Sequence, residues 1–444
     1  MRRRSFISHI ALQTFALSVP GTLYAMGENR EGKQFGTSSR QNKTITKIGN
    51  RSLEDIREVF RHELFDITLP LWKKDGVDWK YGGYLPHIDE NGNITTTNKS
   101  LYYQGRVLWL YSYFYNMFDN DERFLLSAKT GFDFLTKYCV DDKYDWFTEV
   151  TREGEPITKF FDIYASIYTI LGLGEYYKAT GIEEACDIAV KSAYRANEII
   201  LSPHYQAQGH GPYYKPGTKR LGTWLHFLNA LTPLLKYTED SGVEKIARMC
   251  VRNMLQYHWQ PDLGVAFEIL QPNFLPHPND FFIDEETKST QNRARWVNNF
   301  HTMEAAWMIM EEALRVGNTG MFRAGMDFGR VHIEKGWVDR GSEKGLVQFY
   351  MPDYPETLEK NDIIKPYVFK EMFILLLLAL EHDPEADWAA EWFDKSFGYA
   401  YDAGLEWPWR DTLHQPRGVM YCYEILGRMI ERNGKASDFF DNAS

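Results

Sequence analysis

Two titratable residues stand three positions apart in a segment that otherwise reads as a buried helix. The segment Asn298–Glu312, NNFHTMEAAWMIMEE, carries His301 and Glu304 among mostly apolar residues. Residues three apart lie on the same face of a helix. A histidine oriented by a carboxylate is a good general base near neutral pH, and the carboxylate stabilises its charged form. Because the order is not His-Glu-x-x-His, the segment predicts acid–base chemistry rather than a zinc-peptidase site.

Three further polar residues lie in apolar or aromatic segments and are candidates for the same site. They are Arg106 in SLYYQGRVLWLYSYF, His226 in GTWLHFLNAL and His414 in EWPWRDTLHQPRG. Taken alone, each is more often a satisfied structural residue than a catalytic one. Their equivalent positions at the ends of repeated units favour a shared cleft. No spacing marks a glycosidase carboxylate pair, although such a pair can be assembled in space.

The elements that must position these residues repeat along the chain. Long segments with apolar residues at helical spacing alternate with short Gly-aromatic stretches that predict β-hairpins. The hairpin stretches begin at Gly82, Tyr144, Gly211, Leu263, Lys344 and Gly404. Their period of about 60 residues fits two helices and a hairpin, and stacked helix pairs bury each other's apolar faces.

Six helix pairs can close into a ring in which inner and outer helices alternate. We therefore predict an all-α fold, an (α/α)6 barrel or toroid, with short β-hairpins at one end. The alternative is an open helical array. The closed ring is favoured because Pro and Gly are confined to the hairpins and the repeat count is six.

The N-terminus predicts an exported protein. The segment MRRRSFISHIALQTFALSVPGTLYAMG has a basic start, a mostly apolar run and small residues near Ala25. Arg3 and Arg4 resemble a twin-arginine signal, and the alternative is a basic helix that stays on the protein. We expect an export signal over residues 1–25, a flexible polar leader over 26–50 and one catalytic domain over 51–435. The mature protein would be periplasmic or secreted.

Composition and charge limit the classes of binding partner that we expect for this protein. The net charge is −11 and the basic residues are scattered, so no nucleic-acid partner is expected. The nine apolar residues Met372–Leu380 are too few to cross a bilayer and predict a buried helix, so the mature form should have no membrane partner. Four widely spaced cysteines predict buried free thiols. The 13 Trp, 27 Tyr and 28 Phe suit both a helical core and sugar stacking. The oligomeric state is not predicted.

Three motifs together resemble the N-acylglucosamine 2-epimerase family, which includes cellobiose 2-epimerases and aldose–ketose isomerases. GGYLPHIDENGNITTTNKSLYYQGRVLWLYSYFYN is similar to the family's Gly-Gly segment followed by Lys, aromatics, Gln and Arg. NNFHTMEAAWMIMEE resembles its His-x-x-Glu-x-x-Trp helix, and WRDTLHQPRG resembles its C-terminal Trp, His and Arg cluster. The family fold is an (α/α)6 barrel, in agreement with the repeat count.

The resemblance implies a cofactor-independent and metal-independent isomerase acting on a reducing mono- or oligosaccharide. His301 and His414 would be the acid–base pair, Glu304 would orient His301, and Arg106 would bind oxygens next to the reacting carbon. Substrate contacts are implied for five further residues: Tyr103, His226, Glu371, Trp409 and Arg417. The ring opens, a proton leaves carbon 2, and its return gives either a C2 epimer or a ketose.

Two segments depart from the family pattern where substrate would be held. Asn229 stands where a glutamate usually follows the second histidine by three, and KPYVFKEMF matches the Lys-x-Trp-Trp-x-Gln-x-Glu segment only approximately, through Tyr367 and Glu371. Two other functions stay open. A toroidal glycoside hydrolase or lyase would use acidic catalysts, for which Asp89, Asp162, Glu268 and Glu406 are available. A toroid that binds sugar without catalysis is the other.

Overall fold

The computed structural model describes residues 43–441 except 75, 86, 89–93, 119, 158–161, 207–214, 279–294, 342, 364–368 and 403–412. The expected export signal, the hairpin stretch at Gly404 and the candidate residues Asp89, Tyr367, Glu406 and Trp409 lie outside this part. The segment Met1–Gln41 separates from the unit Asn42–Ser444, and only the second unit is described.

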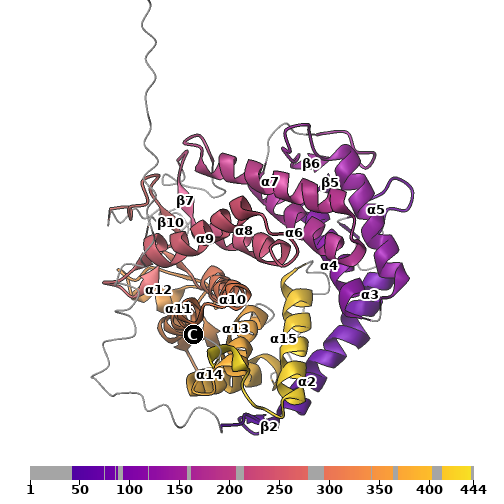
Figure 1. Ribbon diagram of the computed structural model, residues 1–444. Coiled ribbons are helices and arrows are strands. Elements are labelled where there is room, and N and C mark those ends of the chain that lie inside the picture. The colour runs from indigo at the N-terminus through magenta and orange to yellow at the C-terminus, as the bar shows by residue number, and fades with distance from the viewer. Residues whose placement is uncertain are drawn as a thin grey trace, which may run out of the picture. The chain divides into compact units, whose positions relative to one another are not determined.

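Six helices form an inner ring in the described part of the chain (Figure 1). They are α4 (Leu101–Met117), α6 (Ile163–Thr180), α8 (Leu221–Leu234), α10 (Asn299–Val316), α13 (Phe369–His382) and α15 (His414–Glu431). Each contacts the next in this order. The ring closes where Tyr113 of α4 donates a hydrogen bond of 2.6 Å to Glu424 of α15.

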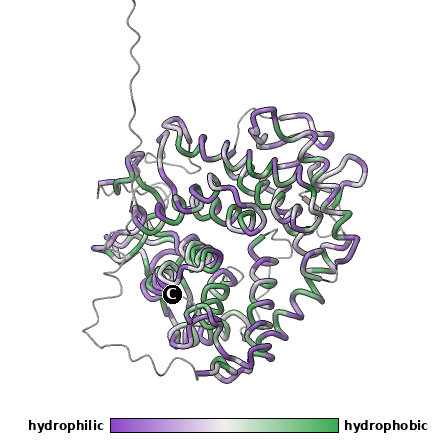
Figure 2. Tube along the Cα trace, viewed as in Figure 1, coloured by the Kyte–Doolittle hydropathy of each residue, from purple (hydrophilic) through white to green (hydrophobic). Residues whose placement is uncertain are grey.

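Outer helices pack behind the inner ring, one behind each member. They are α2 (Leu53–Arg61, continued by a π-helical turn His62–Thr68 and α3, Leu69–Lys74), α5 (Glu122–Tyr138), α7 (Glu183–Leu201), α9 (Ser241–Arg252, continued by a π-helical turn Asn253–His258), α11 (Thr319–Gly336) and α14 (Asp387–Phe397, continued by a π-helical turn Gly398–Asp402). Figure 2 shows hydrophobic and hydrophilic residues alternating along them, as amphipathic helices require. A short helix α12 (Glu356–Lys360) and a 3-10 turn (Asp438–Phe440) complete the helical elements described.

Inner and outer helices differ in how much of their surface is buried, and this difference explains the distribution of apolar residues along them. Every residue of Met372–Leu380 in α13 is at most 1% exposed, so the apolar run is a buried inner helix, as predicted. In the outer helix α5 only one face is buried. The four cysteines are buried free thiols, as predicted. Within the described residues, no helix is long and apolar enough to cross a membrane.

Glycines also lie within the inner helices, which corrects the expectation that they are confined to the hairpins, and they let these helices approach closely. A Cβ on Gly105 of α4 would lie 2.5 Å from the backbone of Tyr168 in α6, and one on Gly172 would lie 2.6 Å from the Gly105 carbonyl. A Cβ on Gly418 of α15 would lie 2.3 Å from Lys370 of α13. Helix pairs packed this tightly fix the relative positions of the polar residues they carry.

The strands form seven two-stranded sheets in the described chain. Four are local: β1 (Lys47–Ile48) with β2 (Arg51–Ser52), β3 (His87–Ile88) with β4 (Ile94–Thr96), β8 (Trp259–Gln260) with β9 (Val265–Ala266) and β12 (Trp337–Asp339) with β13 (Lys344–Leu346). Three join distant segments: β5 (Lys99–Ser100) with β6 (Glu149–Val150), β7 (Lys219–Arg220) with β10 (Ile269–Leu270) and β11 (Val297–Asn298) with β14 (Phe349–Tyr350).

The three long-range pairs correct the expectation that every stretch is a local hairpin. β5, β7 and β11 each lead directly into an inner helix, α4, α8 and α10. Each is paired with a strand from a later loop, all in antiparallel register. These sheets therefore anchor the N-terminal ends of three inner helices, the ends at which the candidate residues lie.

Candidate functional site

The first two turns of the inner helices bring most of the candidate residues together. Besides the partly buried Tyr103 of α4, seven of them lie in these turns: Arg106 in α4, His226 in α8, His301 and Glu304 in α10, Glu371 in α13, and His414 and Arg417 in α15. All are buried except His414, whose side chain keeps 18% of its exposure. The N-terminal end of the ring therefore carries a dense set of titratable groups that solvent still reaches.

His301 is paired with a carboxylate that comes from outside its own helix. Its Nδ1 lies 2.9 Å from Oε2 of Glu268, and Oε1 of Glu268 accepts a bond of 2.7 Å from Nε of Arg220. Burial alone would raise the pKa of Glu268, but attraction to His301 and Arg220 outweighs it and lowers this pKa to about 2. Glu268 is therefore ionised at neutral pH, and Nδ1 of His301 carries the proton donated to it.

The backbone around Glu268 explains its placement. Glu268 lies between β9 and β10; its amide donates to the Trp296 carbonyl at 2.9 Å, and its carbonyl accepts from the Leu221 amide at 2.8 Å. These bonds tie the loop to the starts of α8 and α10. The side chain of Asn298 caps α10 and accepts from the amides of Phe300 and His301. Histidine and carboxylate are thus both held by backbone contacts.

His414 stands in a second cluster of charges. Its Nδ1 lies 3.1 Å from Oε1 of Glu371 and 3.5 Å from Oε1 of Glu304. Nη2 of Arg417 donates to these same two oxygens, at 2.5 Å for Glu371 and 2.7 Å for Glu304. Trp307 donates to the other oxygen of Glu371 at 2.9 Å, and Arg417 lies over its ring.

Charge balance in this cluster keeps Glu304 ionised. Burial would raise the pKa of Glu304, but its hydrogen bond with His414 and attraction to Arg417 hold it well below its usual range. The Arg417 Nη2 nitrogen also lies 3.4 Å from Nδ1 of His414. The distance to Glu371 is shorter, and a carboxylate oxygen accepts hydrogen bonds, so Nδ1 of His414 is assigned as the donor to Glu371.

Arg106 is held by two tyrosines. Its guanidinium lies over the rings of Tyr102 and Tyr168, 3.9 and 4.2 Å from their centroids, and donates to both hydroxyls, to Tyr168 at 2.7 Å. The Tyr168 oxygen lies 3.2 Å from Nδ1 of His226. Burial lowers the pKa of His226 well below its ordinary value, although Glu304 opposes the shift. His226 is therefore neutral at pH 7.

In His301, His414 and His226 the hydrogen bond described above involves Nδ1, so Nε2 is the nitrogen left for the substrate side. His301 and His414 each use Nδ1–H toward a carboxylate, so Nε2 keeps its lone pair and can accept a proton. Because Arg106 already donates to the Tyr168 oxygen, the Tyr168 hydroxyl can donate to Nδ1 of His226, which leaves a proton on Nε2. The site can thus offer two bases and one neutral donor.

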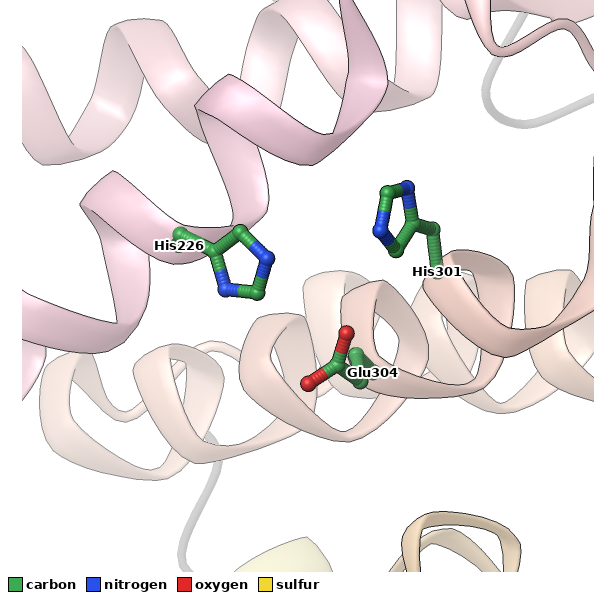
Figure 3. A group of neighbouring side chains, drawn as sticks. All are labelled: His226, His301 and Glu304. Carbon is green, nitrogen blue, oxygen red and sulfur yellow. The ribbon is translucent and has the colours of Figure 1, made fainter. Parts of the chain in front are cut away.

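His226, His301 and Glu304 converge on one point (Figure 3). One ligand atom from each lies within 4.8 Å of the others, and the same holds for Glu304, Glu371 and His414. Glu304 belongs to both groups and lies between the two histidine bases. Its Oε2 is buried and, among the described residues, has no hydrogen-bond partner. Such an atom is an acceptor ready for a ligand hydroxyl or a cation.

The structure corrects the role expected for Glu304. The carboxylate hydrogen-bonded to His301 is Glu268, whereas Glu304 bonds Arg417 and lies beside His414. His-x-x-Glu spacing places both residues on one face, but their side chains turn to different partners. The hydroxyl of Tyr103, for which a substrate contact was expected, donates to the Leu85 carbonyl at 3.4 Å.

Sequence reasoning missed four contributors: Tyr102, Tyr168, Arg220 and the partner role of Glu268. Tyr164 and Tyr168 share the i, i+4 spacing of one helix face, yet aromatic residues at that spacing are common in cores. Glu268 was considered only as a possible hydrolase acid. Asp162, the other described residue considered for that role, caps α6 by accepting from the Tyr164 amide at 3.0 Å. No local pattern links Glu268 to a histidine 33 residues later.

Comparison with known proteins agrees with this geometry. The family model for N-acylglucosamine 2-epimerase (GlcNAc 2-epimerase) matches residues 82–402. N-acylglucosamine 2-epimerase of Rattus norvegicus is 25% identical over 405 residues, 84% of this chain and 92% of the rat protein. Cellobiose 2-epimerase of Eubacterium cellulosolvens is 26% identical over 274 residues, 57% of this chain and 65% of that protein.

A solved structure supports the architecture. Cellobiose 2-epimerase from Spirochaeta thermophila DSM 6192 superposes with a TM-score of 0.66 at 19% identity, covering 85% of this chain and 98% of that chain. The likeness confirms the predicted (α/α)6 barrel. Since the family model covers most of the sequence, the chain belongs to the N-acylglucosamine 2-epimerase family.

Proposed function

We propose that this protein is a cofactor-independent sugar isomerase, which epimerises a reducing sugar at C2 or converts an aldose to a ketose. The observation that carries the proposal is the pair of carboxylate-backed histidines, His301 with Glu268 and His414 with Glu371, at 2.9 and 3.1 Å. Glu304 lies between them. Two bases on different helices suit removal of a proton from one face of a carbon and its return to the other.

The reaction begins with the open-chain aldehyde. The neutral His226 donates a hydrogen bond from Nε2 to a sugar oxygen as the ring opens. Nε2 of one base, His301 or His414, then takes the proton from C2, and its carboxylate partner stabilises the imidazolium formed. The electron pair of the broken C–H bond becomes the enediolate double bond, and negative charge develops on the oxygens. The guanidinium of Arg106, which bonds Tyr168 near His226, supplies the positive charge that stabilises these oxygens.

Return of the proton decides the product. Delivery to the opposite face of C2 by the second histidine, which enters the step as the imidazolium with a proton on Nε2, gives the epimer. Delivery to C1, with transfer of the O2 hydroxyl proton to O1, gives the ketose. Both products come from the same enediolate and the same residues, so the proposal includes both reactions. The substrate class is a reducing sugar. Its hydroxyls can bond Oε2 of Glu304, which has no hydrogen-bond partner among the described residues.

Glycoside hydrolysis is less well supported by these groups. A hydrolase needs a carboxylic acid whose pKa is raised so that it can protonate the leaving group. The pKa values of Glu268 and Glu304 are both lowered, for the reasons given above. Each of these carboxylates also already bonds an arginine, Arg220 or Arg417. They suit the support of histidine bases better than proton donation.

Proton NMR in deuterium oxide tests the proposal. Mannose, glucose, N-acetylglucosamine, cellobiose and mannobiose are incubated separately with the protein. We expect new anomeric signals from at least one sugar together with loss of its C2 proton signal through deuterium incorporation. Shortened sugars without deuterium would assign hydrolysis instead, and no change in any tube would contradict catalysis on these sugars.

We further propose that the protein is exported and acts on free sugars outside the cytoplasm. The supporting observation is the basic and then apolar start of the chain, with Arg3 and Arg4. Cell fractionation of the full chain, compared with an Arg3→Lys/Arg4→Lys variant, tests it. Export of the parent and retention of the variant are expected; equal cytoplasmic retention of both would contradict the proposal.

A further inference from the structure

We propose that His226, His301 and Glu304 also form a binding site for one divalent transition-metal ion, with Zn²⁺ as the probe, and that the bound ion excludes the sugar. The bound ion would inhibit the enzyme and takes no part in the proposed turnover. The binding does not depend on the proposed function. The exclusion of substrate does rest on it, because the same three residues are assigned there to the sugar.

The donor set suits such an ion. Two imidazoles and one carboxylate are a common set for Zn²⁺ and its neighbours. The three side chains point toward one another, two from α10 and one from α8 (Figure 3), with a ligand atom of each within 4.8 Å of the others. Tetrahedral Zn²⁺ with bonds of about 2.0–2.1 Å needs donors roughly 3.3 Å apart. Small side-chain movements close the difference.

Each proposed metal ligand also makes a hydrogen bond through the atom that does not bind the ion. Nδ1 of His301 bonds Glu268, which is the carboxylate–histidine arrangement that orients metal-binding imidazoles. Nδ1 of His226 lies 3.2 Å from the Tyr168 hydroxyl. The Tyr168 oxygen has two lone pairs, so it can accept from both Arg106 and Nδ1–H of His226, in the tautomer that frees Nε2. Oε1 of Glu304 bonds Arg417, and Oε2 is buried with no hydrogen-bond partner in the part of the chain that the structure describes.

The charges favour this group over its neighbour. The other trio with close ligand atoms is Glu304, Glu371 and His414. There the Arg417 guanidinium already bonds one oxygen of each carboxylate, so a cation occupies the shared space. Arg417 is also paired with Glu371, and Glu268 with Arg220.

Calorimetric titration of the protein with ZnCl₂ in a non-chelating buffer tests the binding, and the visible absorption of bound Co²⁺ reports its ligand geometry. We expect one ion per chain and a Co²⁺ spectrum of low coordination number. His226→Gln and Glu304→Gln should weaken Zn²⁺ by more than tenfold, and Glu268→Gln by about 10–100-fold through loss of the support behind His301.

A matched control separates this site from surface binding. His62 is exposed and lies 2.8 Å from Asp66, so the pair is a plausible surface ligand for Zn²⁺. His62→Gln should leave the strong binding unchanged. Loss of binding in His62→Gln, or full binding in both His226→Gln and Glu304→Gln, would overturn the proposal, as would a lack of stoichiometric binding in the parent.

Competition is measured separately with a sugar that the NMR assay identifies. Saturating sugar should raise the apparent Kd for Zn²⁺, and Zn²⁺ should raise KM without changing kcat. If Zn²⁺ binds but no sugar turns over, the proposed function fails and the metal site stands. If sugar turns over and Zn²⁺ binding is unaffected by it, the exclusion is wrong.

Discussion

Nδ1 of His301 lies 2.9 Å from Oε2 of Glu268, a residue of the loop between β9 and β10 rather than of the histidine's own helix. The same carboxylate bonds Arg220, the residue that precedes α8. One side chain therefore links the starts of two inner helices and sets the orientation of His301, a base in the proposed mechanism. The dependence of catalysis on this contact is open to direct measurement.

Glu268→Gln should lower kcat strongly with little change in KM. The amide keeps the shape but cannot stabilise an imidazolium, and an orienting carboxylate of this kind supports about 10²–10⁴-fold of rate. Steady-state kinetics with circular dichroism as a check on folding give the answer. Glu381→Gln is the matched control, since Glu381 is equally buried but pairs with Arg428 and Arg432 at the other end of α13. Equal kcat in the two variants would disprove the role of Glu268.

Gly222→Ala should misplace His301. A Cβ on Gly222 would lie 2.7 Å from Cε1 and 3.0 Å from Nδ1 of that ring, so the imidazole must move. A displacement near 1 Å in a catalytic group costs on the order of 10² in rate. Gly174→Ala serves as the comparison, because its added Cβ meets nothing closer than 3.6 Å. Kinetics of both variants decide: unchanged activity in Gly222→Ala would mean that the ring position is not critical.

Arg417→Met should destabilise the fold as well as abolish activity. Arg417 is 1% exposed and neutralises two buried carboxylates, Glu304 and Glu371. Removing one partner of a buried ion pair typically costs about 3–5 kcal/mol of unfolding free energy. Urea unfolding measures the loss. Arg428→Met should cost much less, because Arg428 is partly exposed and its partner Glu381 keeps Arg432. Similar losses in the two variants would argue against the buried-charge account.

Stability should fall steeply as the pH drops below about 6.5. Burial lowers the pKa of three histidines, His226 well below its ordinary value and His258 and His332 to about 4. The unfolded chain therefore binds protons that the folded chain does not. Their stabilisation is fully present above the unfolded pKa and is lost as the pH falls, by at most about 1.4 kcal/mol per pH unit for each histidine.

Urea unfolding across this pH range tests the expectation, and His258→Gln supplies the comparison. His258 bonds the Phe267 carbonyl and lies outside the proposed site. In the variant, the free energy of unfolding should change less steeply with pH, by the contribution of about one titrating proton. A slope that is the same in parent and variant, or stability that rises toward acid, would contradict the buried neutral histidines.

The fold could be predicted further than the contacts within the site. The six-fold repeat and the apolar run Met372–Leu380 gave the barrel and its buried inner helix, because helical periodicity and length are local properties. The inner helix that carries His226 begins at Leu221, since the pairing of β7 with β10 fixes its start. That pairing joins residues some 50 positions apart, and the sequence pattern does not encode it.

Residue types predicted the site, but not the partners within it. Polar residues in apolar inner helices marked Arg106, His226, His301 and His414 correctly as neighbours at one end of the ring. The exchange of partners between Glu304 and Glu268 depends on where a loop folds against two helices. Spacing alone cannot distinguish a carboxylate that supports a histidine from one that pairs with Arg417.

Hydrogen exchange at C2 in single-histidine variants tests the central claim most directly. His301→Asn and His414→Asn are each incubated in deuterium oxide with both epimers of a sugar that the parent interconverts. Two bases on opposite faces predict that each variant loses epimerisation, yet exchanges the C2 proton of one epimer, and that the two variants exchange opposite epimers. Near-parental epimerisation by either variant, or exchange of the same epimer by both, would contradict the account.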